Sequence, residues 1–242
     1  MMITTLPLLS HDECRRVRDD VRALVDHWLA RPKPPSHFHT LGVNSYMDLG
    51  DPDQRRPDIN YYRDAGRYAQ LLMGSFAWLY ERVRVALEEH LKSKVVFDDL
   101  LAIPGFHIFE VGAIPTQPTA SIHFDLQYLR IDWSGKEVLD RESPISFTLP
   151  VALPRAGGGL RTWNLSYREM ERAVQKGYVQ TIDEMRRFKT CSEHAYSEGV
   201  LQVHSGHMLH QIAPIAGTQT DDERITLQGH GVRRGDNWVL YW

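Results

Sequence analysis

Short runs of β-branched and aromatic residues, separated by glycine and proline, follow one another from Val95 onward. Strands this short, each bounded by turn residues, are typical of β-sandwiches and β-barrels, in which the chain reverses direction after most strands. This pattern predicts an antiparallel β core for the larger part of the chain. The expected strands cover residues 95–98, 101–111, 121–132, 144–153, 159–164, 199–204, 207–212, 223–232 and 237–241.

Amphipathic helices are predicted before this core and once within it. The first covers residues 11–31 and begins at the capping box Ser10-His-Asp-Glu13, in which the serine oxygen accepts from a first-turn amide and the glutamate returns to the cap. The second runs from about residue 63 to 90, where apolar residues recur at helical spacing. The third, from 166 to about 188, opens with another capping box, Ser166-Tyr-Arg-Glu169.

The composition limits both the number of domains and the classes of partner. With 242 residues, of which 42% are hydrophobic and 24% charged, the chain can build one substantial core. We expect one domain over residues 1–242, with helical support and a substrate-covering region in 1–94 and the β core in 95–242. The net charge of −3, from 28 Lys+Arg against 31 Asp+Glu, disfavours a nucleic-acid partner because it provides no basic field for a phosphate backbone.

Cysteine usage and the N-terminal sequence indicate the compartment. Cys14 and Cys191 are the only cysteines and lie far apart, which favours a reducing environment. The first ten residues lack the basic region and long apolar stretch of a signal peptide, and no later segment reaches a membrane-spanning length. We therefore expect a cytoplasmic protein without a membrane partner. The sequence does not indicate an oligomeric state.

Histidine is the one compositional excess, with 12 residues, and one pair of ligand type stands out. His123 and Asp125 lie in the alternating segment Ser121-Ile-His-Phe-Asp-Leu-Gln127, which predicts a strand with both side chains on one face. An imidazole and a carboxylate that point together are two of the three ligands of the facial triad that binds non-haem Fe(II). A third ligand, a histidine, is expected from another strand.

The segment 203–214 offers three histidines for that third position. The spacing favours His210, because a proline follows it at 214 and an arginine at 224, whereas His204 or His207 stays open as an alternative. Arg224 and Thr226 share a strand face by alternation, where a guanidinium and a hydroxyl can hold one carboxylate between them.

Taken together, these residues resemble the motif of the Fe(II)/2-oxoglutarate-dependent dioxygenase superfamily. That motif consists of His-x-Asp, a distant histidine followed by proline, and Arg-x-Ser/Thr. It maps in order onto His123, Asp125, His210, Arg224 and Thr226. Two neighbouring segments, Phe106-His-Ile-Phe-Glu-Val-Gly112 and Gly157-Gly-Gly-Leu160, also resemble this family, and the resemblance covers about residues 100–232.

The resemblance implies a double-stranded β-helix, or jelly roll, with flanking helices and Fe(II) at its open end. It further implies that 2-oxoglutarate chelates the iron through its keto acid, while Arg224 pairs with the distal carboxylate and Thr226 supports it. The implied reaction with O₂ is hydroxylation of an unactivated C–H bond of a small metabolite, such as an amino acid or biosynthetic intermediate, with decarboxylation of 2-oxoglutarate to succinate and CO₂. Halogenation is disfavoured, because the halogenating members lack the carboxylate that Asp125 provides.

Three other functions stay open at this point. The same chemistry can give desaturation or cyclisation, since these reactions diverge after hydrogen abstraction. A nucleic-acid or protein demethylase would use the same site, although the chain has no basic stripe with interleaved aromatic residues. In a different class, a non-oxygenase cupin-like protein could bind a metal through segment 204–210, but it would not need Arg224 or Thr226.

Four further side chains are candidate substrate contacts. Gln127 continues the face of the His-x-Asp pair, and Trp163 follows the glycine-rich turn. Tyr46 and Asn44 belong to a polar loop that could cover the mouth of the site. The histidines at 107 and 230 are expected to have structural roles.

Overall fold

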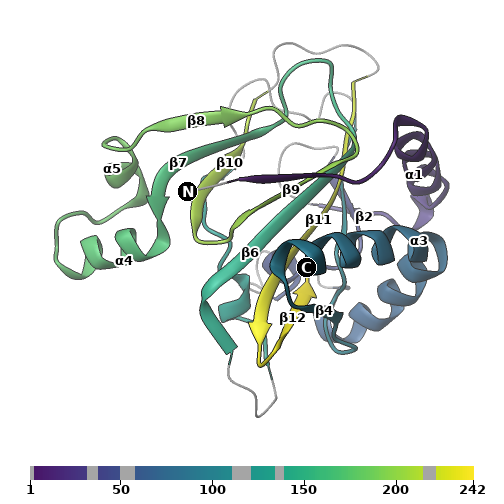
Figure 1. The fold of residues 1–242 in the computed structure, drawn as a ribbon, viewed down its shortest axis with the longest axis horizontal. Coiled ribbons are helices and arrows are strands. Elements are labelled where there is room, and N and C mark those ends of the chain that lie inside the picture. Colours follow the sequence, from purple (N-terminus) through teal and green to yellow (C-terminus); the bar gives the residue numbers. More distant parts are fainter. Residues whose placement is uncertain (1–2, 32–37, 50–57, 111–120, 134–138, 215–221) are drawn as a thin grey trace.

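The computed structural model describes residues 3–31, 38–49, 58–110, 121–133, 139–214 and 222–242, which form two β-sheets with helices outside them (Figure 1). Seven strands of the larger, nine-stranded sheet follow one another in the order β1 (Thr4–Pro7), β9 (Val200–Ser205), β6 (Leu139–Ala152), β11 (Arg224–Arg234), β5 (Gly105–Phe109), β3 (Phe38–Leu41) and β2 (Leu29–Ala30). The other two are β12 (Asn237–Tyr241), which pairs with β11, and β4 (Lys94–Phe97), which pairs with β12. The smaller sheet has the order β10 (Met208–Ile212), β7 (Leu160–Ser166) and β8 (Cys191–His194).

Successive segments of the chain alternate between these sheets. β5 lies in the larger sheet, and the described segment that follows it reaches the edge of the smaller sheet through a bridge between His123 and His210. β6 returns to the larger sheet, β7 and β8 belong to the smaller one, and β9, β10 and β11 alternate again. This winding is that of a jelly roll. The predicted fold class, mainly β with flanking helices, is therefore confirmed.

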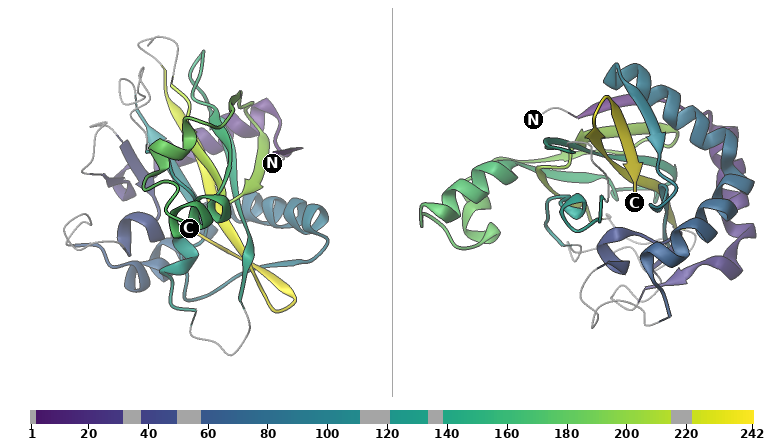
Figure 2. Two further views of the ribbon diagram at one scale, coloured as in Figure 1. Left: turned by 90° about the vertical axis from the view of Figure 1, so that its left-hand side faces the viewer. Right: turned by 90° about the horizontal axis from the view of Figure 1, so that it is seen from below.

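Two helices pack on the outside of the larger sheet, α1 (His11–Ala23) and α3 (Tyr61–Leu91) (Figure 2). Their apolar faces belong to the same buried cluster as the sheet: Leu79 of α3 lies in it together with Leu149 of β6 and Leu227 of β11. Burial of this apolar surface is the main stabilising contribution to such a layer. None of the helices in the described part of the chain is long and apolar enough to cross a membrane.

The predicted helices differ from the observed ones at their ends. The helix expected over 11–31 ends at Ala23, because the chain continues as a 3₁₀ turn, Val25–His27, and then pairs as β2. The helix expected over 166–188 is two helices, α4 (Tyr167–Gln175) and α5 (Ile182–Arg186), between which Gly177 adopts a left-handed φ of 70°. A left-handed residue ends a helix, and glycine adopts that conformation without strain.

The largest error among the predicted strands concerns residues 121–132. In this segment only His123 makes a ladder pair, and Gln127–Leu129 form a 3₁₀ turn. Part of the strand expected over 101–111 is also missing, since β5 begins at Gly105, and residue 111 lies outside the described residues. The strands β1, β2, β3 and β8 were not predicted, because two to four residues carry too little alternation to be recognised without their partners.

A buried ion pair fixes the loop that carries two of the candidate substrate contacts. The Arg31 guanidinium donates to Asp48 at 2.7 Å and to Thr40 of β3 at 2.9 Å, and both side chains of the ion pair are almost fully buried. Asp48 lies at the end of the short helix α2 (Ser45–Asp48), and its side chain also accepts a hydrogen bond from the backbone amide of Asn44. These contacts hold α2 against the edge of the larger sheet.

Gly105, at the start of β5, lies where the sheet is too closely packed for a side chain. A Cβ there would overlap the indole of Trp242 and lie 2.8 Å from the Leu41 carbonyl oxygen, whereas a Cβ at Gly66 of α3 would meet nothing within 4 Å. We expect Gly105→Ala to lower the free energy of unfolding by about 1–3 kcal/mol through overpacking. The control Gly66→Ala should raise it by about 0.5–1 kcal/mol, because alanine is the better helix former. Urea denaturation measures both, and an unaffected Gly105→Ala variant would contradict the described packing.

Candidate metal centre

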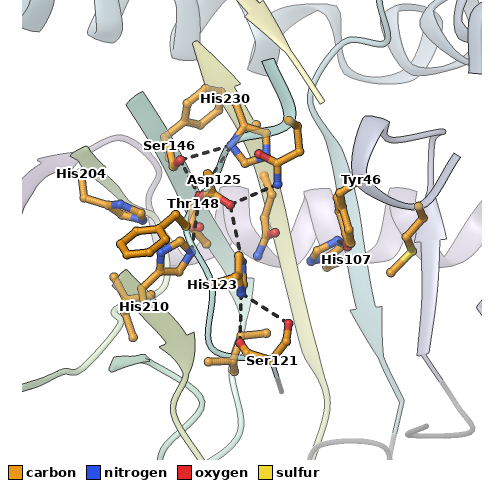
Figure 3. Close-up of a pocket in the computed structure, with 18 of the residues that line it drawn as sticks. Tyr46, His107, Ser121, His123, Asp125, Ser146, Thr148, His204, His210 and His230 are labelled. Carbon is orange, nitrogen blue, oxygen red and sulfur yellow. Dashed lines mark hydrogen bonds and ion pairs between the residues drawn. The ribbon is translucent and has the colours of Figure 1, made fainter. Parts of the chain in front are cut away.

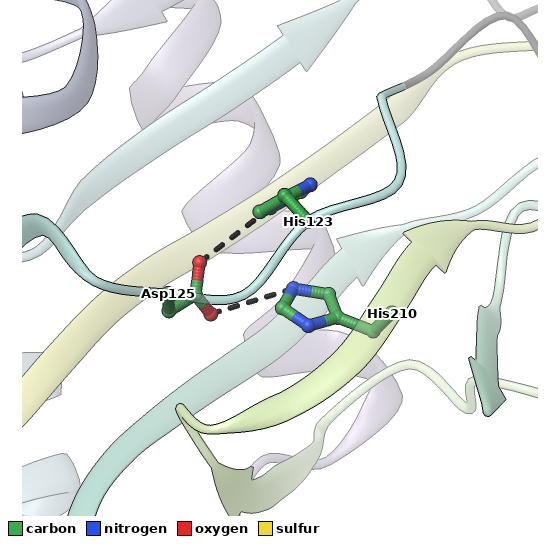
Figure 4. A group of neighbouring side chains, drawn as sticks. All are labelled: His123, Asp125 and His210. Carbon is green, nitrogen blue, oxygen red and sulfur yellow. Dashed lines mark ion pairs between the residues drawn. The ribbon is translucent and has the colours of Figure 1, made fainter. Parts of the chain in front are cut away.

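Three side chains with metal-binding atoms meet at the edge of the smaller sheet (Figure 4). One ligand atom from each of His123, Asp125 and His210 lies within 4.8 Å of the others. The Nε2 of His123 is 3.5 Å from Asp125 Oδ1, and the Nε2 of His210 is 3.4 Å from Asp125 Oδ2. Of the three histidines left open as the third position, the structure brings His210 into this group.

Backbone pairing brings these residues together, although the segment around His123 is not a regular strand. The amide of His123 donates to the carbonyl of His210, and the amide of His210 donates back, both at 3.0 Å. Two residues further on, the amide of Asp125 donates to the carbonyl of Gly206 at 2.8 Å. The His-x-Asp segment is therefore held in register against β10 and the turn that joins it to β9.

Each histidine of the group presents Nε2 to the centre, because its Nδ1 has a carbonyl partner. Nδ1 of His123 lies 2.9 Å from the carbonyl oxygen of Ser121, and Nδ1 of His210 lies 2.8 Å from that of Met208. A carbonyl only accepts, so both Nδ1 atoms carry the proton in the neutral rings and both Nε2 lone pairs are free. This is the form in which histidine binds a metal ion.

The pKa shifts agree with a site built for a cation. Burial lowers the pKa of His210 to about 3. Burial also opposes ionisation of Asp125, but the imidazoles of His210, His230 and His123 outweigh it and hold the pKa of this carboxyl well below its usual value. Although burial disfavours the charged form of His123, Asp125 outweighs that effect and raises the pKa of His123. A proton and a metal ion would compete for the same Nε2 atom.

Neighbouring side chains orient the carboxylate of Asp125. The Ser146 hydroxyl on β6 donates to Oδ2 at 2.6 Å, and the Gln127 amide donates to Oδ1 at 3.2 Å. His230 on β11 lies behind Ser146, with its Nδ1 3.2 Å from the Ser146 oxygen. His230 was expected to have a structural role only, yet alternation along the strand from Arg224 places residue 230 on the same face and could have identified it.

A large cavity opens beside this group, and the buried side chain of Arg224 lies in its wall. Arg224 is 1% exposed; its Nε donates to the Gly158 carbonyl at 2.9 Å and its Nη1 to the Thr226 hydroxyl at 3.4 Å. Among the described residues, none is a hydrogen-bond partner of its Nη2. The guanidinium carbon lies 5.6 Å from the ring centre of Phe109. No carboxylate within the described ranges pairs with this guanidinium.

A buried, unpaired guanidinium is costly unless an anion compensates it. Burial lowers the pKa of Arg224, which expresses this cost. The cavity has a volume of about 690 Å³, and His123, Asp125 and His210 line it (Figure 3). Arg224 lines the same cavity, so a bound carboxylate could satisfy the free Nη2. The residues present therefore fit a metal ion and an anionic ligand in one cavity.

The four candidate substrate contacts divide into two pairs. Tyr46 and Gln127 line the cavity, and the Tyr46 hydroxyl lies 2.6 Å from Nε2 of His107, which also lines it. The structure does not bring Trp163 or Asn44 into the lining. Trp163 points to the outer face of β7 and packs with Leu165 and Met170. The Asn44 side chain instead caps α2, accepting from the Met47 amide.

The two alternative histidines lie outside the three-residue group. His204 lines the cavity, with its ring centre 4.9 Å from that of His210 and its Nδ1 3.0 Å from the Ser205 carbonyl oxygen, but it does not belong to the group of converging ligand atoms. His207 lies away from the cavity, with its Nε2 2.9 Å from the Tyr128 hydroxyl. The side chain of Thr226 contacts Arg224 and accepts from the Gln228 amide at 3.3 Å.

Comparisons with known proteins show what this fold resembles. No family model and no curated protein matches the chain. An N-substituted L-amino acid dioxygenase from Burkholderia ambifaria AMMD, solved in complex with alpha-KG, is 13% identical, covers 99% of this chain and 86% of its own, and has a TM-score of 0.58. SnoN, a non-heme alpha ketoglutarate dependent epimerase from nogalamycin biosynthesis, is 12% identical over 96% of this chain and 80% of its own, with a TM-score of 0.54.

A third solved structure is HygX from Streptomyces hygroscopicus, with nickel, 2-oxoglutarate and hygromycin B bound. It is 12% identical, covers 94% of this chain and 82% of its own, and has a TM-score of 0.50. At these identities the similarity establishes the architecture: the chain shares its jelly-roll fold with these solved structures.

Ser146 provides a test of the metal centre that leaves all three candidate ligands in place. Ser146→Ala removes the hydrogen bond to Asp125 Oδ2, and we expect metal affinity to fall by about 10–100-fold because the carboxylate loses its orientation. Competition with a chromophoric chelator, using Fe(II) under anaerobic conditions, measures the affinity. The control is Ser192→Ala on β8, an exposed residue outside the cavity. Equal affinities of the two variants would contradict the role of Ser146.

Proposed function

We propose that this protein is an Fe(II)/2-oxoglutarate-dependent oxygenase that hydroxylates a small molecule. The observation that carries the proposal is Arg224: its buried guanidinium lacks a partner at Nη2 within the described ranges and lines the same cavity as the three-residue group. A metal-binding protein without a cosubstrate would have no use for this buried charge. The non-oxygenase cupin-like alternative is therefore disfavoured.

In this proposal His123, Asp125 and His210 hold Fe(II), and Arg224 holds the distal carboxylate of 2-oxoglutarate. Thr226 supports the guanidinium from the neighbouring position on β11. When bound, Fe(II) and 2-oxoglutarate activate O₂, so that 2-oxoglutarate is decarboxylated to succinate and a substrate C–H bond is oxidised. The protein's own contribution is to fix the ligands, to neutralise the cosubstrate and to shield the reaction from water.

The cavity volume of about 690 Å³ lies in the range of small-molecule sites, so we propose a free metabolite as substrate. The similar solved structures include an amino acid dioxygenase and an enzyme crystallised with hygromycin B, which supports this substrate class. A nucleic-acid demethylase is disfavoured by the net charge of −3. Both cysteines are free, which suits the cytoplasmic location that we propose.

Hydroxylation is our first choice of reaction, and desaturation or cyclisation is the second. Asp125 is held by Ser146 and Gln127 in a position to occupy a coordination site, so we do not propose halogenation. The three reactions differ in where the substrate carbon lies in the cavity.

Anaerobic absorbance spectroscopy tests the metal and the cosubstrate together. We expect Fe(II) plus 2-oxoglutarate to give a visible charge-transfer band in the wild-type protein and in His11→Ala, which changes an exposed residue of α1. His123→Ala should abolish the band, because one ligand of the three is lost. No band in the wild type, or an unchanged band in His123→Ala, would contradict the proposal.

Arg224→Ala separates cosubstrate binding from metal binding. Removal of the buried guanidinium should weaken 2-oxoglutarate binding by about 2–5 kcal/mol, the usual effect of truncating one partner of a buried charge pair. Metal affinity should change much less. Anaerobic titrations with 2-oxoglutarate and with Fe(II) give the two affinities, and Arg233→Ala, at an exposed position of the same strand, is the control. Equal losses of both affinities would show a structural role for the arginine instead.

A further inference from the structure

The 3₁₀ turn Gln127–Leu129 directly follows the candidate ligand Asp125, and Arg130 ends it. Residues three apart eclipse one another along a 3₁₀ helix, so Gln127 and Arg130 share one side of the turn. Both residues line the cavity. Neither has a role in the metal and cosubstrate sites beyond the hydrogen bond from Gln127 to Asp125.

The turn is anchored on its other side. Tyr128 is 2% exposed, and its hydroxyl lies 2.9 Å from Nε2 of His207. The Tyr128 carbonyl accepts from the indole of Trp133 at 2.7 Å. With its backbone and one buried side chain held in this way, the turn offers Gln127 and Arg130 to the cavity from a fixed position.

Gln127 has a free acceptor close to the metal centre. Its Nε2 donates to Asp125 Oδ1 at 3.2 Å, and because a carboxylate only accepts, this contact fixes which end of the amide faces Asp125. The other end, Oε1, is buried and has no hydrogen-bond partner in the part of the chain that the structure describes. An unsatisfied buried acceptor calls for a donor, and a donor supplied by a ligand would lie beside the metal-binding carboxylate.

Arg130 places a positive charge at the opening of the cavity. It is an exposed residue that also lines the cavity, in contrast to the deeply buried Arg224. Among the described residues no acidic side chain forms an ion pair with it, and Asp125 is the one acidic residue that they contribute to the cavity lining. The cavity therefore has two guanidinium groups at different depths, and a single cosubstrate carboxylate would engage the inner one.

We infer that Gln127 and Arg130 select the substrate: a small acid whose carboxylate pairs with Arg130 and whose nearby N–H or O–H donates to Gln127 Oε1. This is the chemistry of an α-amino or α-hydroxy acid. The side chains of Phe38 and Met47 line the same cavity and suit an apolar side chain on that acid. The inference rests on the proposed oxygenase function, because it assigns the inner guanidinium to 2-oxoglutarate.

Calorimetric binding to the protein loaded with Fe(II) and 2-oxoglutarate, without O₂, tests the carboxylate contact. The probes are L-leucine, L-methionine and L-phenylalanine, each compared with its own carboxamide. We expect at least one acid to bind, and to bind tenfold or more tightly than its amide. Arg130→Gln should remove that preference, whereas Arg172→Gln, at an exposed position of α4 outside the cavity, should retain it.

A second comparison tests the donor contact. The acid that binds is compared with its desamino analogue, for example L-leucine with 4-methylpentanoate. The amino acid should bind tenfold or more tightly, and Gln127→Leu should reduce this preference to less than threefold while Arg130→Gln leaves it in place.

The absorbance band of the Fe(II) and 2-oxoglutarate complex, recorded before each titration, distinguishes the possible failures. An intact band with no acid bound, with equal binding of acid and amide, or with a preference that survives Arg130→Gln would overturn the inference and leave the proposed function standing. Equal binding of the amino acid and its desamino analogue would remove Gln127 from the recognition element. A missing band would overturn the proposed function and this inference together.

Discussion

The arrangement of the site depends on one buried carboxylate. Asp125 is 5% exposed, and a charge at such a position is tolerated only when it is paired and hydrogen-bonded. Its partners come from separate parts of the fold: Ser146 from β6 of the larger sheet, His210 from β10 of the smaller sheet, and Gln127 from the turn that follows. The carboxylate thus connects the two sheets where they border the cavity. A metal ion bound there would give the carboxylate of Asp125 its strongest contact.

The charged groups around the cavity favour a cation at one place and an anion at another. Two histidine nitrogens and a carboxylate converge at one end, which favours a cation. The unpaired guanidinium of Arg224 lies in the wall, which favours an anion. A keto acid chelated to a metal ion satisfies both at once, since one end binds the metal and the other end is a carboxylate. β11, which carries Arg224, is a central strand of the larger sheet, and α1 and α3 pack on the outside of that sheet.

Much of this architecture was accessible from the sequence, and the exceptions have physical causes. The long strands and both capping boxes have strong local patterns, and alternation correctly placed Arg224 and Thr226 side by side. His123 and Asp125 were expected on a regular strand, but the pairing of residue 123 with β10 and the contact with Gly206 align them instead. Such pairing joins segments that are distant in the sequence, so it produces no recognisable pattern in the residues around position 123. Trp163 was assigned to the cavity face of β7, yet α4 and α5 cover the opposite face and bury its indole there.

We propose that one cavity holds a keto acid between the metal centre and Arg224. The most direct measurement is an anaerobic absorbance titration of the Fe(II)-loaded protein with 2-oxoglutarate and with 2-oxopentanoate, which has the same keto acid without the distal carboxylate. If Arg224 binds that carboxylate, 2-oxoglutarate should bind about 30-fold more tightly or better, equivalent to about 2 kcal/mol. Equal affinities for the two keto acids would contradict the account.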